Sequence, residues 1–101
     1  MSGLRLFVLT MLFLLLPLTV LAGDPVVGKN IYTRHCMGCH GASGAGMMPG
    51  LPNFSRGEQL FKSDNELMDT VRNGNGVMPS FGGLISEEEI RDVVAYLRTF
   101  L

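Results

Sequence analysis

The chain lacks the cysteine pairs that stabilise many small domains and the basic patches that mark nucleic-acid-binding proteins. Its 101 residues include only two cysteines, and because these lie three positions apart they cannot close a useful disulfide loop. Basic and acidic side chains are nearly balanced, at 8 and 9, and no basic patch marks a nucleic-acid surface. No segment alternates apolar and polar residues as a half-buried strand does. The sequence therefore predicts an all-α protein that does not bind nucleic acid.

No apolar run in the chain reaches the roughly 20 residues that span a bilayer. The longest, at 6–21, has 16 residues and is interrupted by Pro17. Arg5 precedes this run and small residues end it at Ala22, which is the organisation of a secretory signal peptide. We expect residues 1–22 to be removed, leaving a single domain at 23–101. A retained membrane anchor is the alternative.

Three segments of this domain carry helix signals, at 23–36, 63–74 and 86–101. In the first, Asp24 can cap the helix and Pro25 suits the first helical position. We expect Val27, Ile31 and Tyr32 to lie close together on one face of this helix. The second and third segments begin with capping boxes, in which a serine precedes a glutamate by three positions: Ser63 with Glu66, and Ser86 with Glu89.

The segments between these helices are irregular. Residues 41–62 are rich in Gly, Pro, Ser and Asn, and so long a loop in a small domain indicates a loop wrapped around something. A domain of about 80 residues or fewer often needs a disulfide, a metal or another staple. A large bound cofactor is the obvious alternative to a disulfide. Leu51, Phe54, Leu60 and Phe61 are apolar enough to face inward.

The motif at 36–40 reads Cys-Met-Gly-Cys-His. Two thiols in one helical turn can add to the two vinyl groups of haem, and the histidine that follows can then donate a ring nitrogen to the iron. The motif thus predicts one haem c, bound through Cys36 and Cys39, with His40 as an iron ligand. A redox CxxC would need a βαβ context, and a zinc site would need a second pair of ligands.

On these residues, the chain resembles the class I c-type cytochromes, specifically the small bacterial monohaem ones. Gly28 and Tyr32 ahead of the CxxCH match the family's first helix, and Ala95-Tyr96-Leu97 match its last. Gly41, Gly46, Pro49 and Leu51 match the loop between, and Met78-Pro79 match its second ligand segment. The resemblance implies a cytochrome c fold, with three or more short helices and long loops around one covalent haem. It also implies that the first and last helices cross closely at Gly28.

The second axial ligand must come from the other side of the haem. Met78 lies 38 residues beyond His40, which leaves ample chain to cross over, whereas His35 and Met37 lie on the side of His40. Met48 is the main rival. The resemblance implies that the Pro49 carbonyl accepts a hydrogen bond from His40 Nδ1, which would hold Met48 on that side. We therefore predict His40 and Met78 as the ligands. Arg56, Tyr32 and Asn53 are candidates for the haem propionates by residue type only.

The leading functional hypothesis is a periplasmic one-electron carrier between larger respiratory redox proteins. It is expected to be a monomer that docks transiently at the exposed haem edge, around Met37, Ala42, Met47 and residues 78–81. With both axial positions filled, we do not expect an enzyme. One alternative is an accessory cytochrome for maturation or reduction of a nitrite reductase. Another is an enzyme or gas sensor with a labile Met78.

Overall fold

The computed structural model describes Gly3, Arg5 and residues 22–101. The expected signal peptide at 1–22 therefore lies almost entirely outside the described part. The described chain forms four α-helices: α2 (Pro25–His35), α3 (Met37–His40), α4 (Asp64–Asn73) and α5 (Glu87–Leu97). Two 3₁₀ turns complete it, η1 (Phe54–Arg56) and η2 (Arg98–Phe100). The predicted all-α class is thus confirmed.

The helix ends follow the predicted local signals. Asp24 caps α2 by accepting hydrogen bonds from the N–H groups of Val26 and Val27, and Pro25 occupies the first turn. Both capping boxes are formed in full, at Ser63 with Glu66 for α4 and at Ser86 with Glu89 for α5. Each box satisfies backbone donors that would otherwise lack a partner at the helix start.

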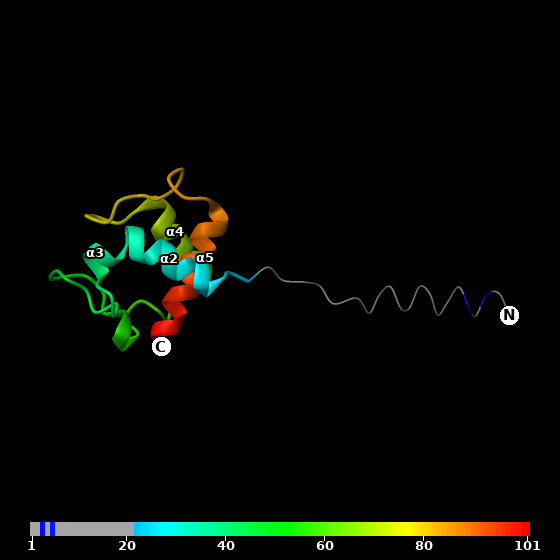
Figure 1. Cartoon of the computed structure of the whole chain (residues 1–101), viewed down its shortest axis with the longest axis horizontal. Coiled ribbons are helices and arrows are strands. Elements are labelled where there is room, and N and C mark those ends of the chain that lie inside the picture. The colour runs from blue at the N-terminus through cyan, green and yellow to red at the C-terminus, as the bar shows by residue number, and fades with distance from the viewer. Residues whose placement is uncertain (1–2, 4, 6–21) are drawn as a thin grey trace.

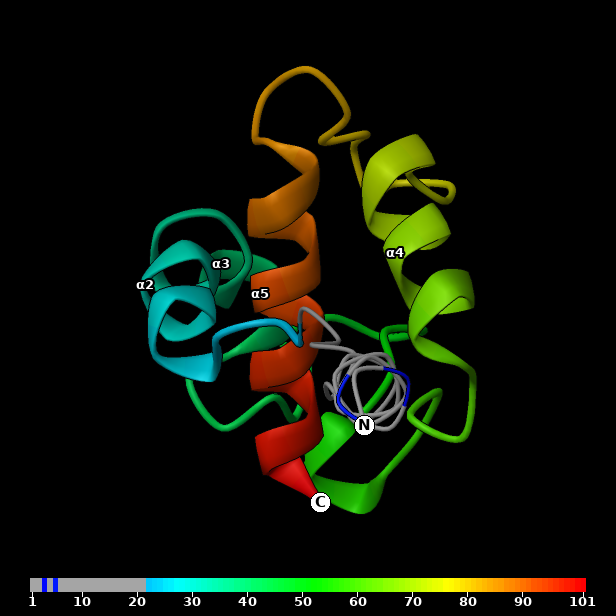
Figure 2. The same ribbon diagram turned by 90° about the vertical axis from the view of Figure 1, so that its right-hand side faces the viewer.

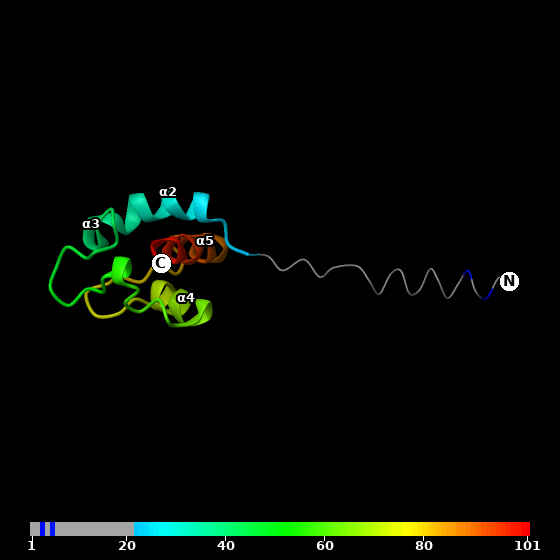
Figure 3. The ribbon, with the colours of Figure 1, turned by 90° about the horizontal axis from the view of Figure 1, so that it is seen from below.

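Helix α5 lies between α2 and α4, and Figures 2 and 3 show this order from two directions. The predicted close crossing of α2 and α5 is present at Gly28. A Cβ atom there would lie only 1.9 Å from the Asp92 carbonyl oxygen and 2.9 Å from the Tyr96 Cβ. The short distance between the two backbones therefore requires glycine at this position. Glycine has a low helix propensity, so this close contact lowers the intrinsic stability of α2.

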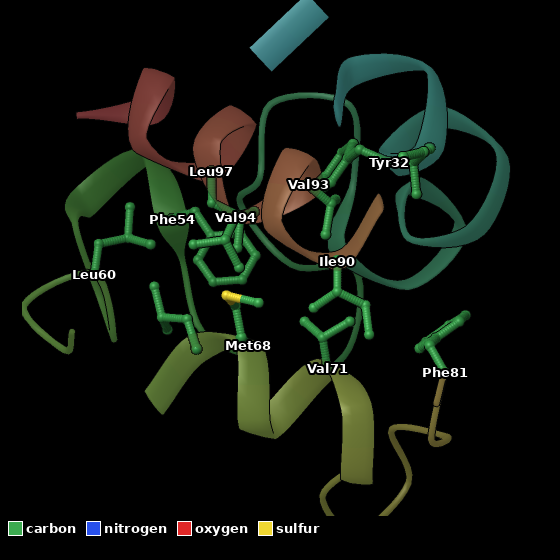
Figure 4. Close-up of a cluster of buried hydrophobic side chains, with 12 residues drawn as sticks. Tyr32, Phe54, Leu60, Met68, Val71, Phe81, Ile90, Val93, Val94 and Leu97 are labelled. Atoms are coloured by element: carbon green, nitrogen blue, oxygen red, sulfur yellow. The ribbon is translucent and has the colours of Figure 1, made fainter. Parts of the chain in front are cut away.

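The apolar core fills the space on both sides of α5. Met68 and Val71 of α4 point toward Ile90, Val93 and Val94 of α5 (Figure 4). Ile31 and Tyr32 of α2 cover the opposite side of α5 and are each 1% exposed. Val27, which we expected on the same face of α2, is 41% exposed. The buried face of α2 is set by the contact at Gly28, and Val27 lies at its margin.

Two long irregular segments complete the fold, residues 41–63 and 74–86. Both extend toward α3, at the left in Figures 1 and 3, away from the point where the described chain begins. Arg98 secures the first of them by donating hydrogen bonds to the carbonyl oxygens of Leu60 and Lys62 and by pairing with Asp64 at 2.7 Å. In the described part of the chain, no helix is long and apolar enough to cross a membrane.

Candidate functional site

A cavity of about 930 Å³ opens between α3, the two irregular segments and the inner faces of α4 and α5. This volume is in the range of roughly 300–1,000 Å³ that is usual for ligand sites. A smaller pocket of about 50 Å³ adjoins it at the end of the molecule where α3 lies. The residues that line both are Cys36, His40, Leu51, Val77 and Met78. The structure therefore brings together the cysteine, histidine and methionine that the sequence singled out.

His40 enters the cavity wall from the end of α3. Its ring stacks on that of Phe54, with ring centroids 5.0 Å apart, and Phe54 is itself buried. Burial lowers the pKa of His40, which keeps the imidazole neutral and its nitrogens available to a metal. Among the described residues, no group accepts or donates a hydrogen bond at the buried Nδ1 atom of His40.

The hydrogen bond expected from His40 Nδ1 to the Pro49 carbonyl is not made within the described part of the chain. Pro49 does line the large cavity, in the loop that follows α3. A buried polar nitrogen without a partner costs about 1–3 kcal/mol, so a small movement of this loop that supplied an acceptor would be favourable. The role of Pro49 stays a prediction.

The two cysteines flank the turn that ends in His40, and both are free thiols. Cys36 is half-buried at the junction of the two cavities, whereas Cys39 is exposed and borders the smaller one. Burial, and then the neighbouring Cys39, raise the pKa of Cys36 to about 11. Cys36 is thus a neutral thiol at physiological pH, the form that adds as S–H across a carbon–carbon double bond.

Met78 reaches the cavity from the second irregular segment. Its backbone N–H and carbonyl exchange hydrogen bonds with Asn75, each 3.0 Å long, which closes a tight turn. Gly74 has φ +78° and lies so close to the turn that a Cβ would be 2.7 Å from the Met78 carbonyl oxygen. Phe81 N–H then donates to the Val71 carbonyl of α4. The methionine is therefore held on a backbone with little freedom to move.

The other expected cavity residues divide into three groups. Leu51 and Phe54 line the large cavity, as predicted. Phe61 also borders it but is 82% exposed, so the expectation that it faces inward is wrong; it lies on the rim because Arg98 fixes the carbonyls on either side of it. His35 and Met48 line the small pocket.

Of the candidates for the propionates, only Tyr32 is among the residues lining the cavity. Its hydroxyl is already engaged, because it donates a hydrogen bond to the Gly41 carbonyl oxygen. The polar residues that do line the cavity were missed from the sequence: Glu58, Gln59, Lys62, Thr70 and Asn75. Lys62 is the only lysine or arginine among the cavity-lining residues of the described chain, and no local sequence signal marks it.

The hydrogen bond of the Tyr32 hydroxyl predicts how the stability of the fold depends on pH. It lies 2.6 Å from the Gly41 carbonyl oxygen, and burial, followed by the nearby Cys36 and Tyr96, raises its pKa to about 12. The neutral hydroxyl therefore stabilises the fold fully below pH 10, and this contribution is lost as the pH rises through about 12. At neutral pH, Tyr32→Phe should lower the free energy of unfolding by roughly 1–2 kcal/mol.

Denaturant melts at rising pH would check this. The stability deficit of Tyr32→Phe should shrink between pH 10 and about 12, because only the wild type loses the contribution of the hydroxyl. Tyr96→Phe, in a ring 5.2 Å from that of Tyr32, is the control. A deficit that stayed constant over this range would contradict the assigned pKa.

These residues fit a covalent haem. His40 and Met78 line one cavity. The imidazole of His40 is neutral, with a buried Nδ1 that has no partner in the described chain, and the thioether of Met78 lies on a rigid turn. The two thiols lie beside the imidazole in the same turn of helix. When bound, the haem iron would supply reversible one-electron oxidation and reduction. The chain supplies the attachment points, the donor atoms and an apolar enclosure.

Comparison with known proteins points the same way. Residues 23–97 match the family described as cytochrome C oxidase, cbb3-type, subunit III. The chain is 35% identical over 81 residues to cytochrome c6 of Bryopsis maxima, covering 74% of this chain and 90% of that protein. It is similar to the solved cytochrome c6 of the diatom Phaeodactylum tricornutum, with a TM-score of 0.60, 32% identity, and 76% and 93% of the two chains covered. A further solved c-type cytochrome gives a TM-score of 0.66, 28% identity, and 72% and 95% coverage.

Proposed function

The chain belongs to the class I c-type cytochromes, and we propose that it is a periplasmic electron carrier whose haem iron is held by His40 and Met78. Membership of the family establishes one covalent haem c and electron transfer without catalysis of a substrate reaction. The ligand pair, the attachment residues, the compartment and the respiratory partners belong to the proposal.

The placement of His40 and Met78 in one cavity, on separate segments, carries this proposal. Histidine comes from α3, which is fixed to α2, and methionine comes from a turn that is hydrogen-bonded to α4. With a ligand from each segment the iron would have no open position for a substrate, so electrons would pass only between the haem and a partner. A soft thioether ligand also favours the reduced iron and raises the reduction potential.

Cys36 and Cys39 are the proposed attachment points. They are the only cysteines in the sequence, and each borders the pocket into which His40 and Met78 also project. In each thioether, one thiol S–H adds across a vinyl group, with sulfur bonding to one carbon and hydrogen to the other. Leu51 and Phe54 complete the apolar wall beside them.

The proposed location follows from the N-terminal segment. The family match begins at Gly23, directly after the expected cleavage site, which supports a domain at 23–101. Export would place the protein with respiratory redox proteins of the periplasm, to which it would bind transiently as a monomer.

The absorption spectrum and reduction potential of the purified holoprotein test this function. We expect a low-spin spectrum with a sulfur-to-iron charge-transfer band, reversible reduction by one electron, and no binding of carbon monoxide without denaturant. Carbon monoxide binding to the native protein would contradict the filled sixth position and favour a gas sensor. A stable complex with a nitrite reductase would instead favour the accessory role.

A further inference from the structure

Two segments, residues 36–55 and 73–86, supply every residue that lines the smaller pocket except His35, and they contain no Asp, Glu, Lys or Arg. All the Asp, Glu, Lys and Arg residues of the domain lie outside these two segments. In Figure 1, α3, the loop that follows it and the first part of 73–86 lie at the left end of the molecule, and the later part of 73–86 runs back to the start of α5. We call the surface formed by residues 36–55 and 73–86 the neutral face.

Charges at one border of the neutral face, next to residues 73 and 86, are paired with one another. Arg72, directly before residue 73, pairs with Asp69 and with Glu87, which follows residue 86, and the Arg72–Glu87 contact is 2.6 Å. At another border, Arg34 and His35 lie near Glu89, whose pKa is lowered mainly by its hydrogen bonds with Ser86 and further by these two groups. Fields from these border groups therefore partly cancel before they reach the neutral face.

The neutral face also presents apolar side chains outside the cavity itself. Met47 is 68% exposed and Met37 is 37% exposed, and neither lines the cavity. Ala42 and Ala45 are exposed between them in the sequence. Unbranched methionine side chains adapt their shape to a partner without a fixed charge pattern.

Electron transfer at the cavity mouth requires a partner to approach this face. Charged side chains around the cofactor of that partner would lose their water of hydration on contact and would meet no opposite charge on the neutral face. We propose that the neutral face docks redox proteins whose own surface around the cofactor is uncharged and apolar, so that association is not steered by charge. This inference rests on the proposed function and names the partner class of the same site.

Self-exchange of electrons between ferric and ferrous holoprotein tests the proposal, because each copy then offers the other a neutral face. The rate constant should change by less than about twofold as ionic strength rises from about 0.01 M to about 1 M, which shortens the Debye length from about 30 Å to about 3 Å. Met47→Glu should slow self-exchange at low salt by roughly threefold or more, and salt should restore the rate. Asn65→Glu, on α4 outside the neutral face, is the matched control and should leave the rate unchanged.

Small redox reagents provide an independent measurement of the field at this face. Oxidation of the ferrous protein by anionic hexacyanoferrate(III) and by a cationic cobalt(III) complex should show similarly weak salt dependence. Steep slopes of opposite sign for the two reagents would overturn the neutral face as the electron-transfer surface. A holoprotein that is not reversibly reduced at all would instead overturn the proposed function.

Two further outcomes would assign the face to another occupant. Cosedimentation of the holoprotein with uncharged phosphatidylcholine vesicles, lost in Met47→Glu, would indicate a lipid surface. A stable dimer in sedimentation equilibrium, dissociated by the same variant, would indicate a second copy of the chain. Either result would overturn the proposal.

Discussion

Replacing Met78 by alanine is expected to lower the reduction potential by about 0.1–0.3 V, a fraction of the roughly 0.8 V range that axial ligands set. The substitution removes the only sulfur that the 73–86 segment offers to the cavity, so the thioether no longer favours the reduced iron. Covalent attachment should persist, because Cys36 and Cys39 are unchanged. Loss of the sulfur-to-iron band, with the haem still bound after denaturation, is the measurement.

Met48→Ala is the matched control, since Met48 also precedes a proline and also lines the small pocket. It should keep both the band and the potential. The reverse pattern, in which Met48→Ala loses the band while Met78→Ala keeps it, would assign the ligand to the loop after α3. Added imidazole should bind Met78→Ala and not Met48→Ala, which separates an open sixth position from a general loosening of the fold.

Much of the site was predictable because its signals are local. The CxxCH spacing places two thiols and an imidazole in one turn, and the structure forms that turn as α3. The capping boxes at Ser63 and Ser86 set the starts of α4 and α5 for the same reason. Such signals depend on three to five neighbouring residues and leave little room for alternative structures.

The long loops were not predictable in detail, because contacts distant in sequence decide them. Phe61 is apolar and was expected inside, but Arg98, 37 positions further on, holds the neighbouring carbonyls and leaves Phe61 on the rim. Lys62 reaches the cavity lining for the same reason. The side-chain types at positions 61 and 62 carry no information about the hydrogen bonds that Arg98 donates to the backbone there.

The crossing of α2 and α5 leads to the second large prediction, which concerns stability. Gly28→Ala would place a Cβ atom 1.9 Å from the Asp92 carbonyl oxygen, and both neighbouring groups belong to helix backbone or to a Cβ that cannot move aside. The two helices must therefore separate. Overpacking costs about 1–3 kcal/mol and occasionally more, and a contact of 1.9 Å with backbone puts this site at about 3 kcal/mol, of which the better helix propensity of alanine returns about 1 kcal/mol.

We expect a net loss of about 2 kcal/mol or more, which in a domain of this size lowers the melting temperature by roughly 10 °C. Gly38→Ala is the control, because Gly38 also lies in a helix but its added Cβ meets nothing in the described chain within 4 Å beyond its chain neighbours and its own helix. It should melt at or above the wild-type temperature. Thermal melts followed by far-ultraviolet circular dichroism on holoprotein of equal haem content measure both.

The haem spectrum of Gly28→Ala separates a packing effect from a site effect. His40 is tied to α2 through Cys36, whose N–H donates to the Tyr32 carbonyl, and Tyr32 packs on the side of α5 that the separation would open. If the crossing supports the site, the sulfur-to-iron band should therefore disappear at a lower temperature in this variant, together with the helical signal. A variant that melted within about 2 °C of the wild type would show that the helices can separate at almost no cost, and that the glycine is not required by packing.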